Sequence, residues 1–252
     1  MKYQYIENKT AAQTIIFLHG WCCEPNDFKA QIKYFKKRYS ILSPNYSTFI
    51  LDRSGKQSHS YLQSITHAVA SCIAKHNIKN FVLVGHSMGG VIALLLSNIV
   101  KIQLHALIII DTTMSLPISA VNKGFISQLE SDSSTEHLKH IIQQKMINQT
   151  YDDLTRMKIK IVEMLQFWQQ APNKFVKLLG EAYKVDKIAG LEDLTIPTLY
   201  VAAEPPSEDI KVIYKANPNI QVTHIKSGHF IMLNAPNNLN TAIQHFLIKE
   251  KI

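Results

Sequence analysis

Short apolar runs alternate with longer stretches of helical periodicity along much of the chain. The apolar runs are rich in β-branched side chains, which is typical of buried strands. They cover residues 14–18, 39–43, 81–84, 104–110, 196–201 and 221–225. The stretches between them carry apolar side chains three or four positions apart, as Phe28, Ile32 and Phe35 do, and predict helices packed on a sheet. This alternation predicts an α/β fold in which helices flank a mostly parallel central sheet.

Residues 112–185 interrupt the alternation with a run of helical patterns. The central pattern has one apolar stripe, which is more typical of a core than of substrate contacts. The stripe consists of Met157, Ile161, Met164 and Trp168. We therefore predict a helical lid over residues 112–185, inserted before the last two strands, and a core formed by residues 1–111 and 186–252.

Two segments of the chain are polar. Residues 1–10 are polar and hold no apolar segment of the kind a signal peptide needs, and residues 46–58 form a polar, irregular loop. No apolar run reaches the roughly 18 residues that a membrane-spanning helix requires. Three cysteines, Cys22, Cys23 and Cys72, are too few for a disulfide framework or a zinc site. We therefore expect a cytoplasmic protein without a membrane span or a bound metal.

The formal net charge of +8 is compatible with an acidic partner. The basic residues, however, are scattered over positions typical of solvated helix faces, as Lys33, Lys36 and Lys37 are. The pattern therefore favours a solvated basic surface over nucleic-acid binding. It indicates no oligomeric state.

A strand-to-helix turn carries the clearest chemical pattern. Its sequence, Gly85-His86-Ser87-Met88-Gly89, follows one of the apolar strands and precedes an apolar helix. In this context a Gly-x-Ser-x-Gly turn exposes its serine, and the two glycines leave room for the close approach of strand and helix. The free N–H groups at the start of the helix favour a developing oxyanion. Ser87 is therefore the predicted nucleophile.

A serine nucleophile needs a base, an acid that orients the base, and N–H groups that stabilise the oxyanion. The strand 14–18 is followed by His19-Gly20-Trp21, and the glycine lets the backbone turn so that the next N–H points outward. We therefore expect the N–H groups of Trp21 and Met88 to form the oxyanion hole, while His19 holds the loop. His229 is the predicted base because it lies just past the last strand, at the expected catalytic edge. The competing histidines lie on polar helix faces or within a strand. They are His67, His76, His137, His140, His224 and His245.

Two places in the sequence offer the acid. Asp111 directly follows the strand 104–110, at the edge where catalytic groups of parallel sheets collect. The loop over residues 202–209 also holds acidic residues, namely Glu204, Glu208 and Asp209. Both places satisfy the chain order of serine, acid and histidine.

The order of these motifs resembles the α/β-hydrolase superfamily over almost the whole chain. The matching segments are His19-Gly20-Trp21, Gly85-His86-Ser87-Met88-Gly89, Ile196-Pro197-Thr198-Leu199 and Gly228-His229-Phe230. The resemblance implies the α/β-hydrolase fold and a serine hydrolase mechanism. Its members usually carry the acid after the strand near Thr198, in a Gly-x-x-Asp turn, where this chain has a proline in place of the aspartate. Other members place the acid where Asp111 stands, so the resemblance favours Asp111, with Glu204 as the alternative.

A narrower resemblance is to the cofactor-independent dioxygenases that cleave the ring of 3-hydroxy-4-quinolones. It is carried by residues 19–22, 43–46, 108–111 and 204–205. In that subgroup a His/Asp pair deprotonates the heterocycle and oxygen reacts without metal or flavin, but a second histidine follows the serine where this chain has Met88.

We predict a cofactor-free serine hydrolase that cleaves a small, hydrophobic carboxylic ester or thioester through an acyl-enzyme on Ser87. The alternatives are a ring-cleaving dioxygenase and a non-catalytic ligand-binding protein of the same fold. The first would consume oxygen, and the second would bind a ligand without turning it over.

Overall fold

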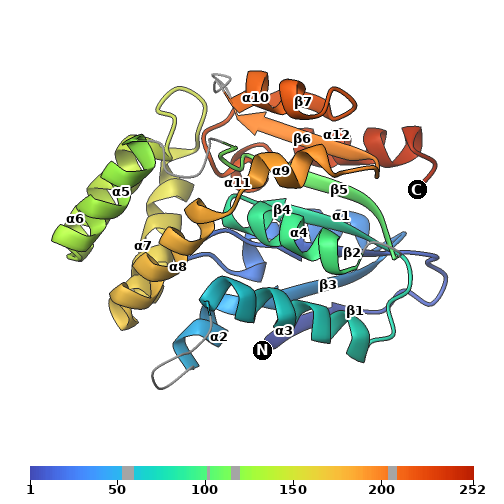
Figure 1. Ribbon diagram of the computed structural model, residues 1–252, viewed down its shortest axis with the longest axis horizontal. Helices are drawn as coiled ribbons and strands as arrows, with labels where there is room; N and C mark the ends of the chain where they lie inside the picture. Colours follow the sequence, from blue (N-terminus) through green and yellow to red (C-terminus); the bar gives the residue numbers. More distant parts are fainter. Residues whose placement is uncertain (53–59, 101–102, 115–119, 204–208) are drawn as a thin grey trace.

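A computed structural model describes residues 1–52, 60–100, 103–114, 120–203 and 209–252, with the side chains of 120–123 and 209 left undescribed. At its centre is a seven-stranded sheet with the strand order β1-β3-β2-β4-β5-β6-β7 (Figure 1). The strands are β1 (Lys2–Ile6), β2 (Thr14–Leu18), β3 (Ser40–Asn45), β4 (Phe81–His86), β5 (Leu104–Ile110), β6 (Thr198–Ala203) and β7 (Gln221–Ile225). Only the β1–β3 pair is antiparallel within this sheet. The predicted α/β fold with a mostly parallel sheet is confirmed.

Helices cover both faces of the sheet, which is why the central strands are apolar on both sides. Every residue of β2 and β4 is buried. Helices α3 (Tyr61–Lys75), α4 (Met88–Ile99) and α9 (Lys187–Glu192) lie on one face, and α1 (Lys29–Phe35) and α12 (Pro236–Lys249) on the other (Figure 1). Shorter helices complete the core: η1 (Pro25–Phe28), α2 (Tyr46–Asp52), α10 (Asp209–Ala216) and α11 (Ile231–Asn234). Among the described helices, none is both long and apolar enough to span a bilayer.

The structure contains a first strand that the sequence analysis did not predict. Residues 2–6 form β1, in which half-buried Tyr3 and Tyr5 alternate with exposed Lys2 and Gln4. This period of two marks a strand with one solvated face, and the polar composition of the segment concealed it. His76 was expected on a solvated helix face. It instead stacks on Tyr5 with ring centroids 4.1 Å apart, so the expectation for His76 is wrong.

The expected loop over residues 46–58 is also wrong in its first half. Residues 46–52 form α2, which buries Tyr46, Ser47 and Ile50 against the core. Asn45 helps to start this helix because its side-chain oxygen accepts a hydrogen bond from the N–H of Thr48. Residues 53–58 of the expected loop lie outside the described residues.

Four helices between β5 and β6 gather beyond one end of the sheet (Figure 1). They are α5 (Ala120–Ser131), α6 (Thr135–Lys145), α7 (Leu154–Gln170) and α8 (Pro172–Lys184). The apolar stripe predicted on α7 is buried. On the same helix, the Lys160 ammonium forms a buried ion pair with Asp27 of η1 at 2.6 Å. This pair ties α7 to the core.

Candidate active site

Ser87 occupies the turn between β4 and α4 in a conformation that few non-glycine residues adopt. Its φ and ψ angles are 54° and −122°. The Ser87 N–H donates to the Ile110 carbonyl at 2.9 Å, and the Thr112 hydroxyl donates to the Ser87 carbonyl at 2.9 Å. These bonds to β5 and to the residue beyond it hold the strained turn in place.

The two glycines of the turn are needed for the close approach that the sequence predicts. A Cβ on Gly85 would lie 2.4 Å from the Gly89 carbonyl oxygen, and one on Gly89 would lie 2.1 Å from the Leu18 carbonyl oxygen. Both contacts are with backbone atoms, which cannot rotate away. The predicted steric reason for these glycines is confirmed.

Asp111 and His229 are in direct contact. The Nδ1 atom of His229 lies 2.7 Å from Oδ2 of Asp111, while Oδ1 of Asp111 accepts a hydrogen bond from the Ala203 N–H at 3.0 Å. A carboxylate accepting from Nδ1–H leaves Nε2 of the imidazole free to accept a proton. The structure therefore pairs the predicted base with the favoured acid. Glu204 and Glu208 lie outside the described residues, and the side chain of Asp209 is not described.

The loop that carries His229 is held by the segment between α6 and α7. The His229 N–H donates to the Met146 carbonyl at 3.1 Å, and the Gly228 N–H donates to the Asp152 carboxylate at 2.6 Å. The other oxygen of Asp152 accepts from the Asn148 N–H at 3.0 Å. A Cβ on Gly228 would lie 2.8 Å from the backbone nitrogen of Asn148 and 2.3 Å from Oδ2 of Asp152, so a side chain there would force this segment to shift. Sequence analysis missed Asp152, because nothing local indicates that it reaches a loop 76 residues away.

His86 is a second histidine in the site that sequence analysis did not assign. It is fully buried, and its Nε2 donates to the His229 carbonyl at 2.9 Å. Burial and the neighbouring His229 ring lower the pKa of His86 well below its usual value, so the ring is neutral at neutral pH. Its Nδ1 would lie 3.0 Å from a Cβ on Gly20, a tight contact that favours glycine there. The only local signal for His86 is its position inside the Gly-x-Ser-x-Gly turn.

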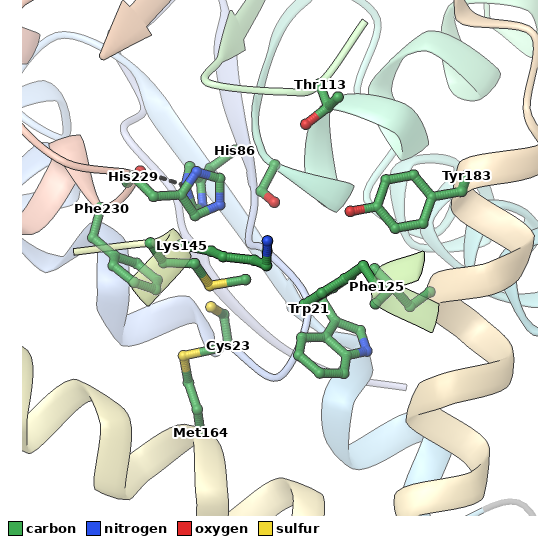
Figure 2. Close-up of a pocket in the computed structure, with 14 residues that line it drawn as sticks. Trp21, Cys23, His86, Thr113, Phe125, Lys145, Met164, Tyr183, His229 and Phe230 are labelled. Carbon is green, nitrogen blue, oxygen red and sulfur yellow. Dashed lines mark hydrogen bonds between the residues drawn. The ribbon is translucent and has the colours of Figure 1, made fainter. Parts of the chain in front are cut away.

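A cavity of about 260 Å³ joins these residues (Figure 2). Ser87, His86 and His229 line it together. In the described structure no hydrogen bond joins the Ser87 hydroxyl to Nε2 of His229, a bond that free enzymes often tighten only when substrate is bound. The remaining lining residues are Gly20, Trp21, Cys23, Thr113, Phe125, Lys145, Met146, Met164, Leu179, Tyr183 and Phe230.

The loop after β2 contributes to the cavity in two ways. Its residue Trp21 lines the cavity, and the Trp21 indole N–H donates to the Phe175 carbonyl of α8 at 2.8 Å. Met88, the other residue expected at the oxyanion hole, is the first residue of α4, so its N–H has no acceptor within the helix. The anchoring role of the indole is not visible in the sequence.

His19 and the neighbouring cysteines are buried and uncharged. The His19 ring stacks on the Tyr46 ring with centroids 3.7 Å apart, and its Nδ1 forms a hydrogen bond with the Gly20 carbonyl at 2.9 Å. Burial lowers the pKa of His19 to about 4. These contacts agree with the expected structural role. Burial raises the pKa of the Cys22 and Cys23 thiols, so neither is a thiolate at neutral pH. Within the described ranges, no three His, Cys, Asp or Glu side chains cluster as metal ligands would.

Comparison with known proteins identifies the family of this fold and site. A profile of the alpha/beta hydrolase family matches residues 15–242. The chain belongs to the alpha/beta hydrolase family. A Mycoplasma genitalium protein named "Putative esterase/lipase 2" is 21% identical over 218 residues, which cover 82% of this chain and 81% of that protein. A Mycoplasma pneumoniae protein of the same name is 35% identical over 96 residues, which cover 38% of this chain and 36% of that protein.

Solved structures of the alpha/beta hydrolase fold superpose on nearly the whole chain. MenH from S. aureus matches with a TM-score of 0.77 at 20% identity, covering 99% of both chains. A thermophilic esterase from Thermogutta terrifontis, solved with malate bound, matches with a TM-score of 0.78 at 18% identity and covers 99% of this chain and 93% of its own. At these identities the likeness establishes the fold.

Proposed function

We propose that this alpha/beta hydrolase cleaves a carboxylic ester or thioester through an acyl-enzyme on Ser87. The observation that carries the proposal is the 2.7 Å contact between His229 and Asp111, because His229 lines the same cavity as Ser87. Family membership and the esterase/lipase names of the relatives support the same reaction class.

The mechanism follows from the chemistry of the three side chains. His229 Nε2 takes the hydroxyl proton as Ser87 Oγ attacks the substrate carbonyl carbon. The N–H groups of Trp21 and Met88 donate hydrogen bonds to the oxyanion that forms. The C–O or C–S bond of the substrate then breaks, and the leaving group departs with the proton from His229. Water, deprotonated by His229, releases the acid and restores Ser87. Asp111 holds the tautomer of His229 and stabilises its charged form throughout.

Residues 112–185 are proposed as the lid of this site. They supply the wall of the cavity opposite the sheet through side chains of α5, α7 and α8, among them Phe125, Met164 and Leu179. The size of the acyl or alcohol group accepted therefore depends on this segment.

The test combines active-site labelling with turnover. A fluorophosphonate should label the native chain, and Ser87→Ala should abolish labelling and lower ester turnover by several orders of magnitude. Thr113→Ala, at another hydroxyl that lines the cavity, is the matched control and should retain labelling. Near-full ester turnover by Ser87→Ala would refute the proposal. Stoichiometric oxygen uptake with a 3-hydroxy-4-quinolone, in the absence of ester turnover, would replace it by the dioxygenase reaction.

A further inference from the structure

Lys145, the last residue of α6, brings a positive charge into the cavity. It lines the cavity together with Ser87 and His229. Figure 2 shows its side chain extending inward, with the amino group toward the middle of the site. The carboxyl end of a helix also favours a cation, but that preference does not require the side chain to turn inward.

Lys145 is exposed to solvent, and no group in the described part of the chain pairs with its charge. Three other lysines of the same inserted segment have partners: Lys160 pairs with Asp27, Lys139 pairs with Glu136, and Lys174 donates to the carbonyls of α2. The Lys145 amino group has neither an ion pair nor a hydrogen bond to any described residue, and no described carboxylate lines the cavity.

A second polar group faces the same space. The Tyr183 hydroxyl points into the cavity from α8 (Figure 2). Burial raises the pKa of Tyr183, so the phenol stays protonated and can donate a hydrogen bond. The rest of the wall is largely apolar, with Phe125, Met164 and Leu179 among its members. An ammonium and a phenol donor in a mostly apolar cavity are complementary to an anionic oxygen group.

We propose that the substrate is a small ester that carries a second, ionised carboxylate, and that Lys145 binds this carboxylate with help from Tyr183. The proposal rests on the proposed ester hydrolysis at Ser87 and narrows its substrate class. The cavity volume of about 260 Å³ lies near the lower end for ligand sites, which favours a compact acid ester over a long-chain lipid. Lys145 then determines specificity without taking part in bond cleavage.

The experiment compares esters that are matched in length and differ in charge. Monomethyl glutarate is paired with methyl pentanoate, which places the carboxylate in the acyl part, and methanol release is measured. A second pair, 4-acetoxybutyrate and butyl acetate, places it in the alcohol part, and acetate release is measured. The native chain should prefer the anionic ester in at least one pair, and added salt should weaken that preference.

Three variants test whether Lys145 causes the preference for the anionic ester. Lys145→Met should lower kcat/KM for the preferred anionic ester by roughly 10- to 100-fold, mainly through KM, because a hydrogen bond to a charged group is lost. The neutral ester should change by less than about threefold. Lys145→Arg should keep most of the preference. Lys139→Met, which removes the same charge from a position of α6 that does not line the cavity, should behave as the native chain.

The outcomes separate the two proposals. If Ser87 is labelled and neutral esters are cleaved, but neither pair shows a preference for the anion, the inference about Lys145 is wrong and the proposed function stands. An equal loss with both members of a pair in Lys145→Met would also overturn it, since that result indicates a structural role. Absence of labelling and of all ester turnover in the folded native chain would refute the proposed function itself.

Discussion

Ser87 and Asp111 both adopt positive φ angles, of 54° and 43°. Such backbone costs of the order of 1–3 kcal/mol for a non-glycine residue, so each must be held by its surroundings. The Ser87 N–H is bound by Ile110 of β5, and the Asp111 N–H is bound by Val201 of β6 at 2.8 Å. The sheet thus holds the proposed nucleophile and the proposed acid at the ends of neighbouring strands.

Asp111→Asn should lower kcat by roughly 10³- to 10⁴-fold with little change in KM, because an amide can hold the wrong tautomer of His229 and cannot stabilise its charge. Steady-state ester kinetics give both constants. Glu204→Gln is the matched control and should stay near the native rate. A severe loss of kcat confined to the Glu204 variant would show that the acid that orients His229 lies in the loop after β6.

Gly89→Ala should destabilise the fold by about 3 kcal/mol, because its Cβ would lie 2.1 Å from the Leu18 carbonyl oxygen and the backbone must shift. Gly180→Ala is the contrasting change. Its Cβ would meet nothing closer than 3.8 Å in the interior of α8, so it should stabilise by roughly 0.5–1 kcal/mol. Denaturant unfolding of both variants measures this, and equal effects would contradict the steric argument.

Helices α5 to α8 together form one wall of the cavity. Phe125 comes from α5, Lys145 from α6, Met164 from α7, and Leu179 and Tyr183 from α8. Each helix is packed on another described element, and α7 and α8 are also tied to the core through Lys160 and Trp21. The shape of the cavity therefore depends on how these helices pack on one another.

Met164→Ala should enlarge the cavity and shift preference toward longer acyl or alcohol chains by roughly 10-fold, since one or two methylenes in an apolar pocket contribute about 1–3 kcal/mol. The measurement is kcat/KM across neutral esters of increasing length. Ile159→Ala, at an exposed position of the same helix, is the control and should leave the profile unchanged. An unaltered profile in Met164→Ala would argue against the proposed lid.

At the scale of the whole molecule, stability is linked to two histidines that are buried without charge. Burial lowers the pKa of His19 to about 4 and that of His86 well below its usual value. In the unfolded chain both would take up a proton near pH 6.5. Between about pH 6.5 and pH 4 the unfolded state therefore binds more protons than the folded state, and acid favours unfolding.

The free energy of unfolding should fall as the pH drops from 6.5 toward 4, by up to roughly 1.4 kcal/mol per pH unit for each of these histidines. Urea unfolding at several pH values measures the slope. His19→Gln should flatten it, whatever its effect on stability at pH 7.5. His224→Gln, at an exposed position of β7, should leave the slope unchanged, and equal slopes in all three proteins would contradict the prediction.

The sequence by itself determined the strand and helix order and the serine turn. Continuous apolar runs such as Leu104–Ile110 have few alternatives to a buried parallel strand, and Gly85 is explained by contacts within its own turn. The contact that requires Gly89 is with Leu18 of β2, a neighbour that the Gly-x-Ser-x-Gly pattern implies but does not name. The sequence analysis made no prediction for β1 and predicted a loop where α2 forms, because both segments are polar enough to hide their buried faces. Asp111 could be placed at the catalytic edge from the strand before it, but the choice over the β6 loop needed a resemblance as well.

Only the tertiary structure decided which distant groups meet. Asp152 reaches Gly228, the Trp21 indole reaches α8, and Lys145 enters the cavity across long separations in the chain. Periodicity reports which face of a helix is buried, but not which other element covers it or where a long side chain at its end turns. These contacts depend on how residues 112–185 pack on the core, and that packing sets the shape and charge of the site.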